Sequence, residues 1–190
     1  MDRIIGAFTF RKGIYLEVEH DTTFTSTAWI IVAVVSVLSQ LGASAGGGFD
    51  DLFGWLVRTV IGTVFALVAF AVGAVVVSWI GRTIFKAEVT FDELVRTLGL
   101  AYVWQAVGVL GVLGAIGALA CIVGPVRLVA ALAGLVASSI AVKEALDLDW
   151  LKVIVTVVIA WVVIGVISLG ATFVIGLLGF GAAAAGGLLG

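Results

Sequence analysis

Five long apolar stretches constrain this chain more than any other feature of its sequence. They cover about residues 24–41, 59–80, 98–119 and 126–142, and a fifth runs from 151 to beyond 174. A membrane-spanning helix needs roughly 20 mostly apolar residues. No charged residue stands well inside any stretch, since Arg127 and Lys152 are each second from an end. The sequence therefore predicts an all-α polytopic membrane protein, a bundle of five transmembrane helices.

Composition supports the same class and excludes several others. Of the 190 residues, 63% are hydrophobic and 12% charged, with a mean hydropathy of +1.31. Soluble domains are about half apolar and about a quarter charged. The single cysteine and single histidine exclude a disulfide within the chain, a multi-cysteine metal site and a His-pair metal site. A net charge of −2 does not favour a nucleic-acid partner.

Polar and small residues indicate where the helices begin and end. Thr90 and Glu93 have the spacing of a capping box, which predicts that the third helix starts at the membrane surface before it enters lipid. Gly124-Pro125 predicts the end of this helix and a tight turn into the fourth. Asp149 is a candidate cap for the fifth helix.

The chain divides into a polar N-terminal segment, residues 1–22, a membrane domain, residues 23–180, and a Gly/Ala-rich tail, residues 181–190. In the first segment, apolar residues share one side of a helical wheel with cations beside them: Ile4, Ile5 and Phe8, with Arg3, Arg11 and Lys12. This pattern predicts a short helix in the headgroup region. An irregular tether is the alternative.

Charge predicts the orientation, because Lys and Arg of short loops gather on the cytoplasmic side. With the N-terminus inside, eight of the ten cations are cytoplasmic, and only Arg58 and Arg127 lie on the other side. We therefore expect a cytoplasmic N-terminus and an extracytoplasmic C-terminus.

The apolar stretches offer no chemistry for an enzyme. Ionisable groups inside a bilayer usually mark ion, proton or substrate paths, but the polar residues here are Ser, Thr and Gln, of which Gln105 is the most polar. A hydrolase needs a nucleophile with a base, or a metal with ligands. Cys121 and His20 are interpreted as an ordinary small residue and a solvated surface residue. We expect no enzyme, no cofactor and no metal.

Glycine recurs every third residue through the third stretch, at Gly108, Gly111, Gly114 and Gly117. Small residues let membrane helices approach closely. At this spacing the row winds slowly around an α-helix, so it can serve more than one neighbour. The alternative is a flexible, kinkable helix.

A partner surface is expected at the cytoplasmic end, on loops 81–97 and 143–151 together with residues 1–22. Charges of both signs are better suited to a protein partner than to anionic lipid alone. The candidate residues are Phe91, Glu93, Arg96, Lys143, Glu144 and Asp147. A merely solvated face is the alternative.

Three stretches carry a resemblance together: Arg3–Gly6 through Tyr15 and Asp21–Thr23, then Phe91–Tyr102, which opens the third span, and Ala141–Asp147 with Lys152, which links spans four and five. They resemble bacterial members of the Ypt-interacting protein (Yip) membrane family. The resemblance implies five spans and a cytoplasmic N-terminus. Eukaryotic relatives bind Rab-type GTPases and shape membranes. A short N-terminal segment and the missing proline after Phe91–Tyr102 are departures, so small-GTPase binding is not carried over.

These observations favour a non-enzymatic scaffold or adaptor that binds partner proteins or shapes the membrane through its cytoplasmic face. The alternatives are a small transporter or channel, which would need a polar cavity in the bundle, and an accessory subunit of a larger membrane complex. The expected partners of this chain are the lipid bilayer and other membrane or cytoplasmic proteins.

Overall fold

The computed structural model describes residues 2–11, 13–45 and 51–189, with side chains described up to residue 177 except at 117. The described residues form helices and turns, and no strand. In chain order the elements are α1 (Asp2–Phe8), α2 (Ile14–His20), α3 (Phe24–Ser44), α4 (Leu52–Thr83), α5 (Phe91–Ala101), the 3₁₀ segment η2 (Tyr102–Leu110), α6 (Gly111–Gly114), the 3₁₀ turn η3 (Gly117–Leu119), α7 (Ala120–Leu146) and α8 (Trp150–Leu189).

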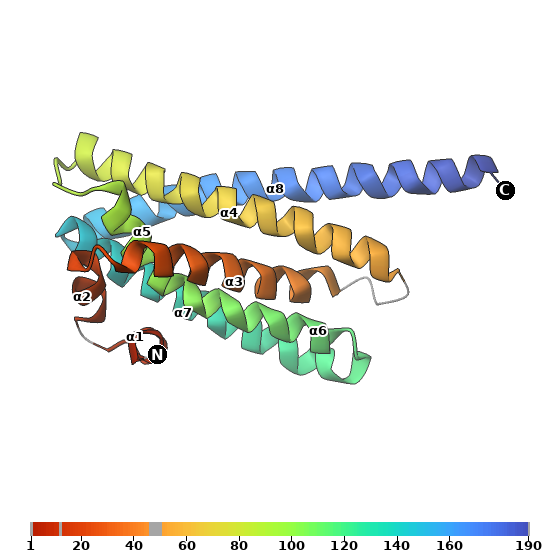
Figure 1. Ribbon diagram of the computed structural model, residues 1–190, viewed down its shortest axis with the longest axis horizontal. Coiled ribbons are helices and arrows are strands. Elements are labelled where there is room, and N and C mark those ends of the chain that lie inside the picture. Colours follow the sequence, from red (N-terminus) through yellow and green to blue (C-terminus); the bar gives the residue numbers. More distant parts are fainter. Residues whose placement is uncertain (1, 12, 46–50, 190) are drawn as a thin grey trace.

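The predicted all-α, five-span architecture is confirmed. Five elements are long and apolar enough to cross a membrane: α3, α4, the composite Phe91–Gly114, α7 and α8. Helices α4 and α8 pack against each other, while α3, η2 and α7 form a second layer (Figure 1). Helix α5 bridges the layers, because it contacts α3, α4 and α7.

The third span changes helix type partway across the membrane. It begins as α5 behind a complete capping box, in which the Thr90 side chain accepts from the Glu93 amide and the Glu93 carboxylate accepts from the Thr90 amide, as predicted. It then continues as nine residues of 3₁₀ helix, η2. Such runs seldom exceed three or four residues, and the sequence did not predict this one.

The turn into the fourth helix comes earlier than Gly124-Pro125, so that prediction is wrong. The third span ends at Gly114, and Pro125 lies inside α7. A 3₁₀ helix rises about 2.0 Å per residue and an α-helix about 1.5 Å. The nine residues of η2 therefore lengthen the span by about 4.5 Å, roughly the rise of three α-helical residues. The chain crosses the membrane in fewer residues and turns sooner.

Buried apolar side chains gather toward the end of the bundle where α2, α5 and α7 meet. One cluster joins the N-terminal helices to the second layer and includes Tyr15, Val32, Val95, Leu100 and Ala137. A second cluster joins α4, α5, α7 and α8. Helix α8 starts directly after Asp149, and its backbone stays helical through most of the predicted tail, to Leu189. A side-chain cap by Asp149 stays a prediction.

Candidate functional site

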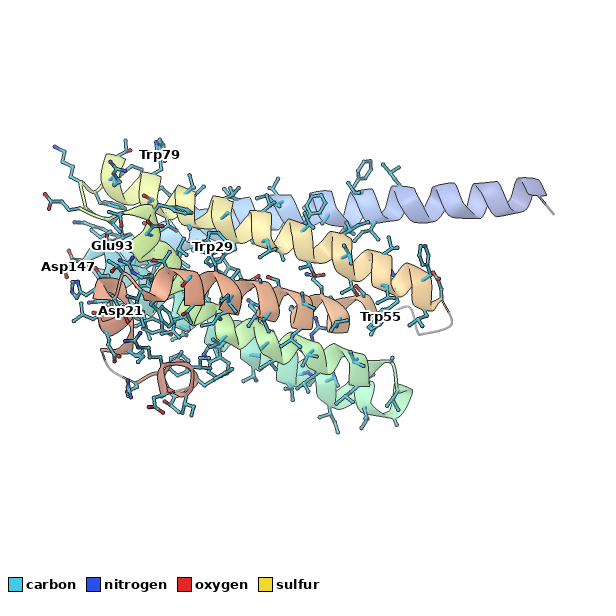
Figure 2. The ribbon with its side chains drawn as sticks, viewed as in Figure 1. Asp21, Trp29, Trp55, Trp79, Glu93 and Asp147 are labelled. Carbon is cyan, nitrogen blue, oxygen red and sulfur yellow. The ribbon has the colours of Figure 1, made fainter. Side chains whose placement is uncertain are left out.

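One end of the bundle holds α1, α2 and the connections between α4 and α5 and between α7 and α8 (Figure 1); we call it the charged end. Figure 2 shows Asp21, Glu93 and Asp147 together at this end and Trp55 at the opposite end. The three stretches predicted to form a partner surface, residues 1–22, 81–97 and 143–151, are therefore close in space. Their side chains nevertheless differ greatly in exposure.

Arg96 is not on the surface, contrary to the sequence-based expectation. Its side chain is 4% exposed, beneath α2. The guanidinium donates from Nε (3.0 Å) and Nη2 to the carbonyl oxygen of Glu19, and from Nη1 to the Thr25 hydroxyl (3.1 Å). A guanidinium donates in a fixed fork, so it can hold the C-terminal end of α2 and the start of α3 at once. Arg96 fastens the N-terminal segment to the third span.

The Glu19 carboxylate lies in the same region and is poorly solvated. Its Oε2 is buried and has no hydrogen-bond partner among the described atoms. Burial raises the pKa of this carboxyl, and the nearby carboxylates of Glu93 and Glu144 raise it further, against the opposing charges of His20 and Arg96. Charged groups on α2, α5 and α7 thus all influence the pKa of the Glu19 carboxyl.

The N-terminal segment is folded against the bundle, so the irregular tether is wrong. Arg3 pairs with Glu17 at 2.9 Å and with Asp21 at 2.6 Å. The Thr23 hydroxyl and then Arg3 lower the pKa of Asp21. Burial raises the pKa of Tyr15 to about 12. The short helix is present, but the apolar residues Ile4 and Phe8 pack on the core, while Ile5 stays exposed.

Two aromatic side chains of this segment cover Trp104 of η2. The ring of Phe8 meets Trp104 edge-on with centroids 5.1 Å apart, and Phe10 stacks on it at 5.4 Å. Aromatic pairs of this geometry stabilise a fold beyond the area that they bury. Helix α1 and Phe10 are therefore tied to the middle of the third span.

The remaining candidates for the partner surface are mostly occupied within the chain. Phe91 packs against the core, and Glu93 belongs to the capping box. Lys143 lies 5.7 Å above the Trp150 ring, and Glu144 is half-buried. Asp147 is exposed and ends α7 in a left-handed conformation, with φ 50°. We group Asp147 with other exposed charged residues of this end and call them the outer charges: Arg82, Lys86, Glu88, Asp92, Asp147 and Asp149.

The glycine row divides between two neighbours. Residues i and i+3 eclipse in a 3₁₀ helix, so Gly108, in η2, and Gly111, which follows it, both face α3. A Cβ on Gly108 would lie 2.6 Å from the Ser39 hydroxyl, and one on Gly111 would overlap the Gly42 carbonyl oxygen. Gly114 instead faces α7, with Val123 at an ordinary 3.7 Å. The surroundings of Gly117 lie outside the described residues.

Two cavities lie within the bundle beside Gln105. A central cavity of about 310 Å³ is bounded by all five spans, and its polar lining includes Ser39, Gln40 and Gln105. A lateral cavity of about 390 Å³ lies between η2 and α7, where Ser39 and Gln105 recur beside Trp104 and Arg127. In the described ranges, no group of three His, Cys, Asp or Glu side chains could hold a metal ion.

Comparison with known proteins identifies the family. The family model of the Yip1 domain matches residues 9–172, most of the chain. The chain belongs to the Yip1 domain family. Neither a curated protein nor a solved structure matches it. The Yip1 match spans α2 to α8, so the Arg96 contacts, the capping box and the glycine row all lie within it.

Sequence reasoning missed Arg127 as a candidate in this Yip1 domain. When Gly124-Pro125 is read as the turn, Arg127 stands at the membrane surface. In the structure α7 begins at Ala120, so Arg127 lies two turns inside a span. Proline is tolerated in membrane helices when neighbouring groups satisfy the freed carbonyl. The apolar residues that precede Gly124 were a signal that the helix could start earlier.

Proposed function

We propose that this Yip1-domain protein is a non-enzymatic membrane scaffold or adaptor whose partner proteins bind at the charged end. The five spans anchor it in the bilayer, its other expected partner. The supporting observation is the way that end is held together. Arg96 joins α2 and α3 to α5, Arg3 pairs within the N-terminal segment, and the capping box fixes the start of α5. A fixed base that presents charges of both signs suits a partner of complementary charge.

We further propose that the charged end faces the cytoplasm, with the C-terminus on the other side. This orientation rests on the eight-to-two distribution of Lys and Arg. A reporter that works only in the cytoplasm should be active when fused after Lys86 or Asp147. It should be silent when fused after Ile116, in the turn at the opposite end. Activity only after Ile116 would reverse the orientation.

Charge reversal at exposed positions tests the partner surface. The triple variant Arg82→Glu, Glu88→Lys and Asp147→Asn reverses two of the outer charges and removes a third. It leaves Arg96 and Glu93 unchanged, because their contacts stabilise the fold. We expect it to lose proteins that co-purify with the parent from native membrane, because like charges across an interface repel.

The matched control keeps the charges at two of these positions, as Arg82→Lys and Glu88→Asp, and combines them with Asp147→Asn. It should retain the partners of the parent protein. Equal melting temperatures in detergent would show that both variants fold. If the reversed variant folds and co-purifies with an unchanged set of proteins, the outer charges are only solvated and the adaptor proposal loses its support.

A small transporter or channel is the second candidate, and the central cavity is the observation that favours it. Ser39, Gln40 and Gln105 line this cavity, and their side chains form no hydrogen bond with other described residues. Unpaired polar groups at membrane depth are costly unless water or a ligand satisfies them. The described residues that line it include no charged side chain, so the cavity suits a neutral solute better than an ion.

A further inference from the structure

The lateral cavity combines a cation with several unused hydrogen-bond donors. Arg127 of α7 lines it together with Gln105 and Trp104 of η2 and Ser39 of α3. The Arg127 side chain is exposed and forms no ion pair or hydrogen bond with the residues described. An ionisable residue within a membrane span is a functional-site hypothesis by default.

The other donors of this cavity also have no acceptor in the protein. Neither the Ser39 hydroxyl nor the side-chain amide of Gln105 forms a hydrogen bond within the described part of the chain. The indole Nε1 of Trp104 is buried, and the same part of the structure offers it no partner. An indole N–H and a guanidinium can only donate. A ligand that satisfies them must therefore supply acceptor atoms.

The electrostatic environment selects an anion. Among the described residues, no Asp or Glu lines the cavity. Of the two acids at this end of the molecule, Asp50 lies outside the described residues, while Asp51 faces Arg58 at 3.7 Å and caps α4 through the Gly54 amide. A guanidinium presents a planar fork that matches phosphate or carboxylate oxygens.

The depth of Arg127 suits the phosphate of a lipid. Helix α7 has 27 residues and is about 40 Å long, whereas the hydrocarbon layer is about 30 Å thick. Arg127 is seven residues after Ala120, about 10 Å along the axis. If the helix extends equally beyond both sides of the layer, this side chain lies within about 5 Å of the hydrocarbon boundary. A long cationic side chain at that depth reaches the headgroup level.

We propose that the lateral cavity binds the phosphate of an anionic phospholipid from the leaflet opposite the charged end, with Arg127, Gln105 and Ser39 as its hydrogen-bond donors. A zwitterionic lipid fits less well, because no carboxylate in the described part of the lining can pair with a choline. This inference goes beyond the adaptor function and does not depend on it, since the two sites lie at opposite ends of the bundle.

A structural role for the same guanidinium is the alternative that the test must separate. Arg127 Nη1 lies 3.0 Å from where a Cβ on Gly111 would stand, beside the Gly42 carbonyl near the C-terminal end of α3. A cation is favourable at the negative end of a helix dipole. If Arg127 serves only α3, replacing it lowers the melting temperature and leaves lipid binding unchanged.

The experiment measures binding of three probes to the full chain, purified in a neutral detergent, by native mass spectrometry and by the shift in melting temperature. The probes are dioctanoyl phosphatidylglycerol, dioctanoyl phosphatidylcholine and inorganic phosphate. We expect saturable binding of phosphatidylglycerol that weakens at least about tenfold in Arg127→Gln, as expected when a charge-assisted contact is lost. Gln105→Leu should also weaken it, and provides the test if Arg127→Gln does not fold.

Arg58→Gln is the matched control, because Arg58 is the other cation of this end and does not line the cavity; it should bind phosphatidylglycerol like the parent. Equal binding of phosphatidylcholine would show that only the acyl chains are recognised. Binding of inorganic phosphate as tight as that of phosphatidylglycerol would replace the lipid with a free anion. Unchanged phosphatidylglycerol binding in both cavity variants would leave Arg127 with its role at α3. Each of these three results overturns the proposal.

Discussion

Replacing Gly111 with alanine should lower the stability of the folded protein in detergent, whereas the same change at Gly114 should be tolerated. A methyl group on Gly111 would overlap the Gly42 carbonyl, and backbone atoms cannot rotate away as a side chain can. Overpacking of a tight interface typically costs about 1–3 kcal/mol. At Gly114 the nearest atom is a Val123 methyl carbon at 3.7 Å, so alanine fits there.

The two variants form a matched pair, because they add the same methyl group to the same short helix, α6. The measurement is thermal unfolding in one detergent, followed by near-UV circular dichroism. Alanine also removes the entropic penalty that glycine carries in a helix, which favours the Gly114 variant by up to about 1 kcal/mol. Equal melting temperatures for both variants would contradict the close approach of α3 to the third span.

The sequence predicts the number of spans because hydrophobic length has one physical meaning in a bilayer. Lipid provides no hydrogen bonds to the backbone, so a long apolar stretch must form a helix. The capping box was predictable for a similar reason, since Thr90 and Glu93 satisfy amides that every helix start leaves free. Both inferences depend only on local sequence.

The helix type of the third span depends on packing, so it could not be predicted from local sequence. Gly108 and Gly111 are three residues apart in the sequence, and this spacing alone does not distinguish an α-helix from a 3₁₀ helix. In the structure both glycines contact α3, at Ser39 and Gly42, and the period of three in a 3₁₀ helix places them directly above one another on that face. The early turn and the depth of Arg127 follow from this change of helix type. One tertiary contact therefore accounts for the wrong turn and for the missed residue.

Side-chain exposure was the other property that sequence could not supply. Arg96 follows the acidic pair Asp92-Glu93 at the start of a membrane helix, where a cation is normally solvated. It is buried because α2 folds over it, and the carbonyl that it binds is 77 residues away in the sequence. The residues named for a partner surface therefore lie at one end of the molecule, although Arg96 is internal. That a partner binds there stays a prediction.

Replacing Arg96 with methionine should release the N-terminal segment from the bundle. Methionine keeps much of the apolar stem but removes the donors to the Glu19 carbonyl and the Thr25 hydroxyl. Hydrogen bonds that involve a charged group are each worth about 1.5–3 kcal/mol. The uncovered carbonyl at the end of α2 would also have to find water. We expect α2 to open locally more often while the spans stay folded.

Hydrogen exchange of the α2 amides, residues 14–20, measures this opening, and trypsin cleavage after Arg11 reports it independently. Both exchange and cleavage should be faster in Arg96→Met than in the parent protein. Arg96→Lys should give intermediate rates, because a lysine keeps the charge without the planar fork. Arg82→Met is the control, since Arg82 is exposed at the same end and its side chain forms no hydrogen bond or ion pair within the described residues. Exchange in Arg96→Met at the parent rate would mean that the aromatic contacts of Phe8 and Phe10 with Trp104 hold the segment without Arg96. Apolar packing, and not the buried Arg96 charge, would then hold the N-terminal segment at the charged end, where partners are proposed to bind.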